Sequence, residues 1–180
     1  MSLLLVFPVC SITTPVFAGE AFSWVEKMDG QVRLSTADGS RYVLPLATSV
    51  DGVFLDERKH SVENSAYLAV LQVSPSNPGK PLGFCGAGVE TRLHVYEVLG
   101  SELRERTNVL ISSCLHSISL RSQNTGGEQQ DVDFSSLKWD AHGFSIDWFS
   151  NKDVLGRSLQ STHYSIEGGA FVTWDVLEKP

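Results

Sequence analysis

The amino-acid sequence predicts an all-β fold, an antiparallel β-sandwich or barrel-like meander of roughly nine or ten strands with little helix. Apolar residues recur at every second position through most of the chain, and turn sequences rich in Gly and Asp separate these alternating runs. The main helix signal is Asp153, which is placed to cap a short helical turn that Gly156 weakens. Two Trp-Asp pairs, at 139–140 and 174–175, keep a small propeller open as a third all-β arrangement.

The first expected strands form a hairpin and a longer run. Residues 31–36 and 41–46 alternate on either side of an Ala-Asp-Gly-Ser turn, which predicts a β-hairpin. Residues 51–55 repeat this pattern, with a short strand after an Asp-Gly pair. Residues 67–73 form a longer alternating strand that Pro75 ends, because proline cannot continue a hydrogen-bonding ladder.

The middle of the chain predicts a second pair of strands, at 93–99 and 109–120. A Gly-Ser turn and the charged residues 102–106 connect them. The second strand is long, and its even-numbered residues, Leu110 and Cys114 among them, are expected to face the core because side chains alternate between the two faces of a strand.

The C-terminal part predicts two further hairpins. Residues 137–139 and 144–148 flank an Asp-Ala-His-Gly turn, and residues 164–166 and 170–176 flank a turn with two glycines. The polar segment 122–130, which precedes them, has no apolar alternation. It predicts a mobile surface loop.

Residues 1–18 predict a cleaved export signal. An apolar run at 3–7 leads to a Val-Phe-Ala sequence, which supplies a small residue for cleavage after Ala18. The segment lacks the Lys or Arg that normally begins such a signal, so a buried N-terminal strand is the alternative. Cleavage leaves residues 19–180 as a single β-rich domain, located in the periplasm or secreted.

The expected location determines which cysteines remain in the mature chain and whether they are oxidised. Cleavage removes Cys10 and leaves Cys85 and Cys114, which we expect to form a disulfide in an oxidising compartment. The bond closes a loop of about 30 residues and stabilises the fold by about 3 to 4 kcal/mol in the chain-entropy model. In the alternative interpretation Cys85 is a thiol nucleophile assisted by His94 or His116.

The net charge of the chain and the spacing of its histidines limit the kinds of partner and ligand that we expect. The chain has 21 acidic and 14 basic residues, a net charge of −7, and its basic residues are scattered, so we expect no nucleic-acid partner. The negative field favours a basic protein instead. No apolar run is long enough for stable membrane insertion. The five histidines show no ligand spacing, and we expect neither a metal nor a cofactor.

One segment has the composition of a binding loop. Residues 74–84 contain three prolines, end next to Cys85, and contain Lys80, Leu82 and Phe84. A stiff loop loses little conformational entropy on association, so these last three are candidate protein-binding residues. The alternative is that Leu82 and Phe84 pack into the core beneath a long connection.

The sequence therefore favours an exported envelope binding protein, an inhibitor or immunity protein against a cell-wall hydrolase or a delivered toxin. It contains no catalytic motif, and no residue is assigned a catalytic role. The first alternative is a periplasmic hydrolase whose site assembles only in three dimensions. The second is a structural or assembly factor that adds a strand to its partner. The residues considered for the hydrolase are His94, His116, Asp131 and Asp147.

Overall fold

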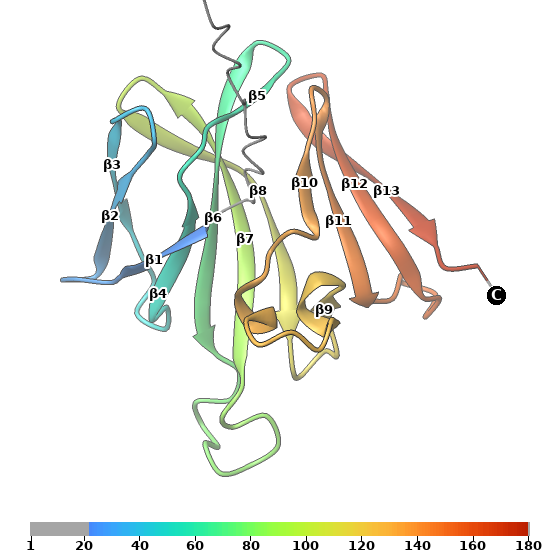
Figure 1. The fold of residues 1–180 in the computed structure, drawn as a ribbon. Coiled ribbons are helices and arrows are strands. Elements are labelled where there is room, and N and C mark those ends of the chain that lie inside the picture. The colour runs from blue at the N-terminus through green and yellow to red at the C-terminus, as the bar shows by residue number, and fades with distance from the viewer. Residues whose placement is uncertain (1–21, 180) are drawn as a thin grey trace, which may run out of the picture.

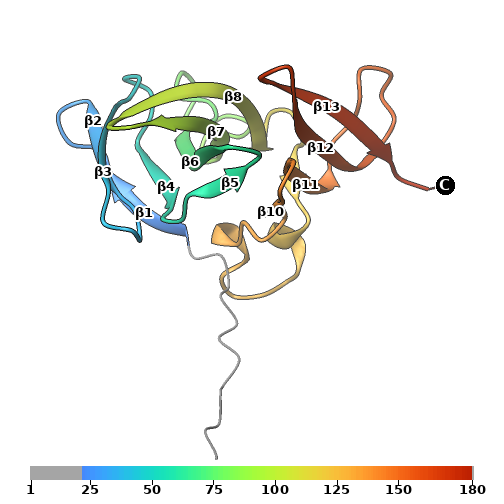
Figure 2. The same cartoon turned by 90° about the horizontal axis from the view of Figure 1, so that it is seen from above.

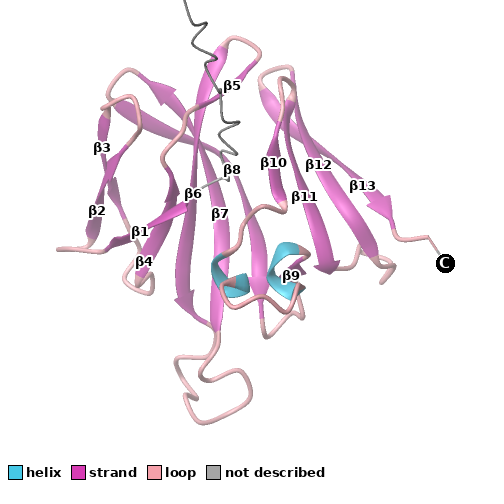
Figure 3. Cartoon of the chain, viewed as in Figure 1, coloured by secondary structure: helices cyan, strands magenta, loops and turns pink. Residues whose placement is uncertain are grey.

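The computed structural model describes residues 22–179, in which β-strands and turns predominate, with two short 3-10 helices and no α-helix (Figures 1 and 3). The predicted export signal lies outside these residues. The elements are β1 (Phe22–Glu26), β2 (Gln31–Ser35), β3 (Arg41–Pro45), β4 (Gly52–Asp56), β5 (His60–Val62), β6 (Ser65–Pro75), β7 (Val89–Leu99), β8 (Glu102–Ser113), β9 (Ser119–Leu120), η1 (Ser122–Asn124), η2 (Gln130–Val132), β10 (Leu137–Trp139), β11 (Gly143–Ser150), β12 (Leu159–Glu167) and β13 (Ala170–Leu177).

The strands form two antiparallel sheets and a separate hairpin (Figure 2). The larger sheet has the order β1-β4-β6-β7-β8, with β5 paired to β6. The smaller sheet has the order β10-β11-β12-β13, with β9 paired to β11. The smaller sheet packs on one face of the larger sheet, and the β2–β3 hairpin packs on the other. The predicted all-β, sandwich-like fold is confirmed, and the propeller alternative is wrong.

Both faces of β6 are buried. Leu68 and Val70 pack with the β2–β3 hairpin, whereas Tyr67, Ala69 and Leu71 pack against the smaller sheet. Consecutive residues of a strand point to opposite faces, so one apolar run contributes to two hydrophobic cores. The strand therefore holds the three layers together.

Trp148 on β11 is the largest side chain that is fully buried between the two sheets. Its indole Nε1 donates a hydrogen bond to Thr162 Oγ1 at 2.9 Å, and Thr162 Oγ1 in turn donates to Asp175 Oδ1 at 2.7 Å. The indole thus brings its large apolar surface into the core without leaving its one donor unsatisfied.

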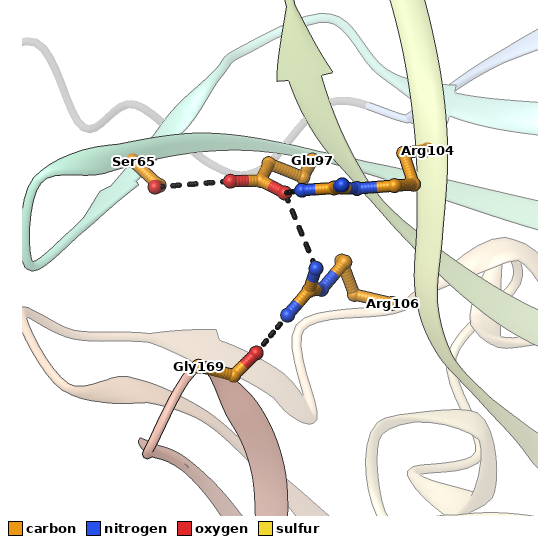
Figure 4. Close-up of polar contacts among 5 residues, drawn as sticks. All are labelled: Ser65, Glu97, Arg104, Arg106 and Gly169. Atoms are coloured by element: carbon orange, nitrogen blue, oxygen red, sulfur yellow. Dashed lines mark hydrogen bonds and ion pairs between the residues drawn. The ribbon is translucent and has the colours of Figure 1, made fainter.

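A polar cluster joins the two sheets near the β12–β13 turn (Figure 4). Glu97 on β7 accepts hydrogen bonds from Arg104 Nη2 at 2.6 Å and from Ser65 Oγ at 3.2 Å. Arg106 Nη1 lies 3.5 Å from the same carboxylate, and its Nη2 donates to the carbonyl of Gly169. The hydrogen bond from Arg104 is the main reason that the pKa of Glu97 lies below its usual value.

The predicted strand at 109–120 is wrong in its bounds. The charged residues 102–106 lie inside β8, where they face Glu97 and its neighbours, and β8 ends at Ser113. Backbone hydrogen bonds in both directions between Ser113 and Ile118 close a tight turn, with Ser117 in the left-handed region at φ 52°. Cys114 therefore lies exposed in this turn and does not face the core.

The expected alternation along β8 is also interrupted. The pairing of β7 with β8 passes from Leu110 to Ser112, so Ile111 is the extra residue of a β-bulge. Ile111 is buried while Leu110 is only half-buried, which reverses the predicted facing at this point.

Two predicted irregular segments also differ from expectation. The segment 122–130 contains η1, and its Ser122 is buried, donating from its backbone N to Ser136 Oγ at 2.8 Å and from Oγ to the carbonyl of Asp133 at 2.6 Å. Asp153 does not cap a helix; it braces a tight turn between β11 and β12. Asp153 bonds backbone groups of its own turn, whereas Ser122 is held by Asp133 and Ser136, which are distant in the chain.

Candidate functional site

The loop between β6 and β7, residues 76–88, extends beyond the sheets at one end of the molecule (Figure 1). Ser76 N donates to the carbonyl of Gly88 at 2.9 Å and closes the neck of the loop. Two successive turns follow inside it, in which Gly83 N donates to Lys80 O at 2.9 Å and Gly86 N donates to Gly83 O at 3.0 Å. Its backbone is thus held by its own hydrogen bonds.

A disulfide anchors this loop to the main sheet. Cys85 and Cys114 are joined, with their Cα atoms 5.7 Å apart, and Cys114 follows directly after β8. The predicted bond is present, and the alternative that Cys85 is a thiol nucleophile is wrong because its sulfur is bonded to Cys114. Cys85 is adjacent to Phe84 in the chain, so the bond restrains the backbone beside this side chain.

Leu82 and Phe84 project into solvent. Leu82 is fully exposed, Phe84 is 78 % exposed, and Lys80 is exposed as well. Asn77 Nδ2 donates to the carbonyl of Phe84 at 3.1 Å and holds the backbone on which the ring is mounted. The alternative in which Leu82 and Phe84 pack into the core is therefore wrong.

The β11–β12 loop presents a second apolar tip at the same end (Figure 1). Val154 is fully exposed and Leu155 is 73 % exposed. Asp153 Oδ1 accepts hydrogen bonds from the backbone N of Leu155 and of Arg157, both at 2.9 Å. These bonds, and above all the one from Arg157, hold the pKa of Asp153 below its usual value. The sequence did not reveal this tip, because its two apolar residues resemble one turn of a helix.

The two tips are connected through the turn that follows β8. Ser150 Oγ, at the end of β11, donates to the carbonyl of Ser117 at 2.7 Å, and the same turn contains Cys114 of the disulfide. Leu115, which follows Cys114 in this turn, is 43 % exposed. The end of the molecule is thus a group of braced loops whose apolar side chains make little contact with the core, the arrangement typical of an interaction surface.

The charge of these tips differs from that of the whole protein. They contain Lys80, Lys152 and Arg157 against a single acid, Asp153, a net charge of +2. Since the whole chain carries −7, the remainder carries −9. A cationic end therefore projects from an acidic body.

The residues considered for a hydrolase are not brought together. His94 Nδ1 contacts Glu105 Oε2 at 3.1 Å, and Asp147 Oδ2 binds Lys138 Nζ at 2.6 Å. His116 lies in the exposed turn after β8, and Asp131 lies in η2. No hydrogen bond joins any two of these four side chains within the described residues.

A buried acid–histidine pair that the sequence did not reveal lies between β4 and β5. Asp56 is 1 % exposed and its Oδ2 lies 2.7 Å from His60 Nε2, while Asp56 Oδ1 accepts from the backbone N of Arg58 at 3.0 Å. Burial opposes ionisation of Asp56, but its hydrogen bonds outweigh this effect and lower its pKa. The His60 ring stacks on Trp139 with 4.3 Å between centroids, beside a depression of about 370 Å³.

These features define a disulfide-linked, sandwich-like all-β protein with braced apolar loops at one end. Comparison with protein-family models, with curated proteins and with solved structures finds no match to the chain. Among residues 22–179, no three His, Cys, Asp or Glu side chains gather into a group that could hold a metal ion. No helix in the same range has the length and apolar character needed to cross a membrane.

Proposed function

We propose that this chain is an exported binding protein of the cell envelope that inhibits a cell-wall hydrolase or neutralises a delivered toxin. The observation that carries the proposal is the loop at 76–88, in which a disulfide and internal hydrogen bonds hold Leu82 and Phe84 in solvent. A disulfide-bonded all-β fold is compatible with an extracellular location.

The loop is suited to entering a cleft. Its backbone is ordered before binding, so association costs little conformational entropy. Burial of Leu82 and Phe84 is worth about 1.5 to 3 kcal/mol for each side chain. Together they supply about 3 to 6 kcal/mol, roughly a hundredfold or more in affinity.

The charge distribution supports a basic partner whose cleft is acidic. The acidic body accelerates the encounter with a basic protein through its long-range field. At short range Lys80 adjoins the apolar tip, and glycan hydrolases carry a pair of carboxyl groups in the cleft. A basic cell-wall hydrolase combines both properties.

The test measures binding of the purified protein to a panel of basic lysozymes and other cell-wall hydrolases by surface plasmon resonance, together with inhibition of cell-wall lysis. We expect micromolar or tighter binding that the double variant Leu82→Ser/Phe84→Ser weakens at least about a hundredfold. Val43→Ser is the control, because Val43 is 57 % exposed on β3, away from the loop. Failure to bind or inhibit any hydrolase in the panel at micromolar concentration contradicts the proposal.

A hydrolase is the second candidate, and the Asp56–His60 pair favours it. A buried carboxylate that orients a histidine is the arrangement of a general base that activates water. With Nε2 bound to Asp56, the other ring nitrogen, Nδ1, is the one available to take a proton. The assay measures the release of soluble fragments from purified cell walls. Release that is lost in a folded His60→Gln variant supports this function. No release by the unaltered protein contradicts it.

A further inference from the structure

We propose that a groove at the end of the molecule opposite the 76–88 loop binds a saccharide. The groove has a volume of about 470 Å³, within the range of small-ligand sites. Its lining comes from the β5–β6 turn, the β10–β11 turn and the adjoining parts of β11, β12 and β13, which lie together at this end (Figure 1). The groove contains no residue of the 76–88 loop.

Hydrogen bonds fix the β10–β11 turn to the β5–β6 turn and to β12. Glu63 N donates to the carbonyl of Ala141 at 3.1 Å, and Ile166 N donates to the carbonyl of His142 at 3.2 Å. Asp140 Oδ1 accepts from the backbone N of His142 at 2.7 Å. The groove is therefore formed before any ligand arrives, which lowers the entropy cost of binding.

Gly143 permits this close packing. A Cβ atom at this position would collide with the carbonyl oxygen of Tyr164 on the neighbouring strand, and Gly143 itself is buried. Glycine lets the two backbones approach at the base of the groove.

An aromatic platform lines the groove. Trp174 on β13 stacks on His163 of β12, with 4.9 Å between centroids and 7° between the ring planes. His163 thus supports one face of the indole, yet Trp174 remains 50 % exposed. A large ring that is held flat while half its surface faces solvent offers a planar apolar surface to a ligand.

Polar side chains line the groove together with this platform. The side chains of Glu63, His142 and Glu167 line the groove and make no hydrogen bond or ion pair with any described residue. Carboxylates accept hydrogen bonds, and a neutral imidazole both donates and accepts. The groove therefore offers directional polar contacts around a flat apolar one.

A pyranose ring fits this combination. One face of the sugar consists of C–H groups that pack on an indole, and its rim carries hydroxyl groups that each need a hydrogen-bond partner. The lining contains too many charged side chains for a purely apolar ligand. The competing ligand is a cationic side chain, which carboxylates beside an indole also attract.

The test titrates the full-length protein with tetramers of β-1,4-linked N-acetylglucosamine, of β-1,4-linked glucose and of α-1,4-linked glucose, followed by tryptophan fluorescence and calorimetry. We expect saturable binding of at least one tetramer, weakened at least about tenfold by Trp174→Ala. Trp24→Ala is the matched control, because Trp24 is 48 % exposed but lies on β1 outside the groove, and it should bind normally. Circular dichroism verifies that each variant is folded.

Glu167→Gln and Glu63→Gln supply a second measurement, since Glu63 is exposed in the β5–β6 turn, Glu167 is exposed at the end of β12, and each change should reduce affinity several-fold. The loop variant Leu82→Ser/Phe84→Ser should bind the sugar normally, which separates failure of this proposal from failure of the protein-binding one. Three results would each overturn the assignment. The first is no binding of any tetramer at about 10 mM, a concentration on the order of the weakest specific affinities. The others are binding that Trp174→Ala does not change, and binding of an arginine peptide in place of a sugar.

Discussion

Removal of the Cys85–Cys114 bond tests how much this bond stabilises the folded protein. The two residues are 29 positions apart, so the bond closes a loop of about 30 residues and restricts the unfolded chain. In the chain-entropy model this restriction is worth about 3.6 kcal/mol at 25 °C. We expect the double variant Cys85→Ser/Cys114→Ser to lose about that much free energy of unfolding, because neither serine introduces a large change of volume.

Urea unfolding measures this loss. With a slope of about 2 kcal/mol per M, the midpoint falls by roughly 1.8 M. Reduction of the unaltered protein should give the same midpoint, which serves as the control for any effect of the serines themselves. A loss below about 1 kcal/mol would refute the reasoning, because the bond would then stabilise the fold far less than its restriction of the unfolded chain requires.

Two further predictions concern the cores and the polar cluster. Trp148→Ala should reduce the free energy of unfolding by about 3 to 5 kcal/mol, measured by the same urea titration, since it leaves a large cavity between the sheets. Glu97→Gln should cost about 0.5 to 1 kcal/mol at pH 7, because the carboxylate is close to the surface and screened. The pKa of Glu97 is lowered in the folded protein, so its contribution is present above the unfolded-state pKa and is lost as the pH falls through the folded-state value. The stability difference between Glu97→Gln and the unaltered protein should therefore shrink on acidification below about pH 4, and a difference that grows would contradict this assignment.

The sequence predicts the fold well where strands have one buried face. The hairpin of β2 and β3 and the two C-terminal hairpins follow from alternation and from their glycine turns. Prediction fails where particular backbone pairings, and not side-chain alternation, decide the structure. The bulge at Ile111 and the turn after Ser113 depend on pairing with β7 and on a local bridge to Ile118, neither of which leaves a periodic signal.

The candidate sites also divide into those that the sequence predicts and those that it does not. The sequence predicts Lys80, Leu82 and Phe84, because proline and cysteine beside them indicate a restrained loop. The Asp56–His60 pair leaves no such signal, because carboxylates at the end of a strand usually face solvent, and the burial of Asp56, the last residue of β4, depends on how β4 and β5 pack. The sugar groove joins two turns and parts of three strands that are separated in the chain, so no local pattern contains it.

The position of β6 has a consequence for thermal unfolding. Alternate residues of one backbone segment belong to the two cores, so neither core can be lost while this strand keeps its ordered conformation for the other. The layers should melt in a single cooperative transition, with equal calorimetric and van't Hoff enthalpies, although they are built from separate clusters.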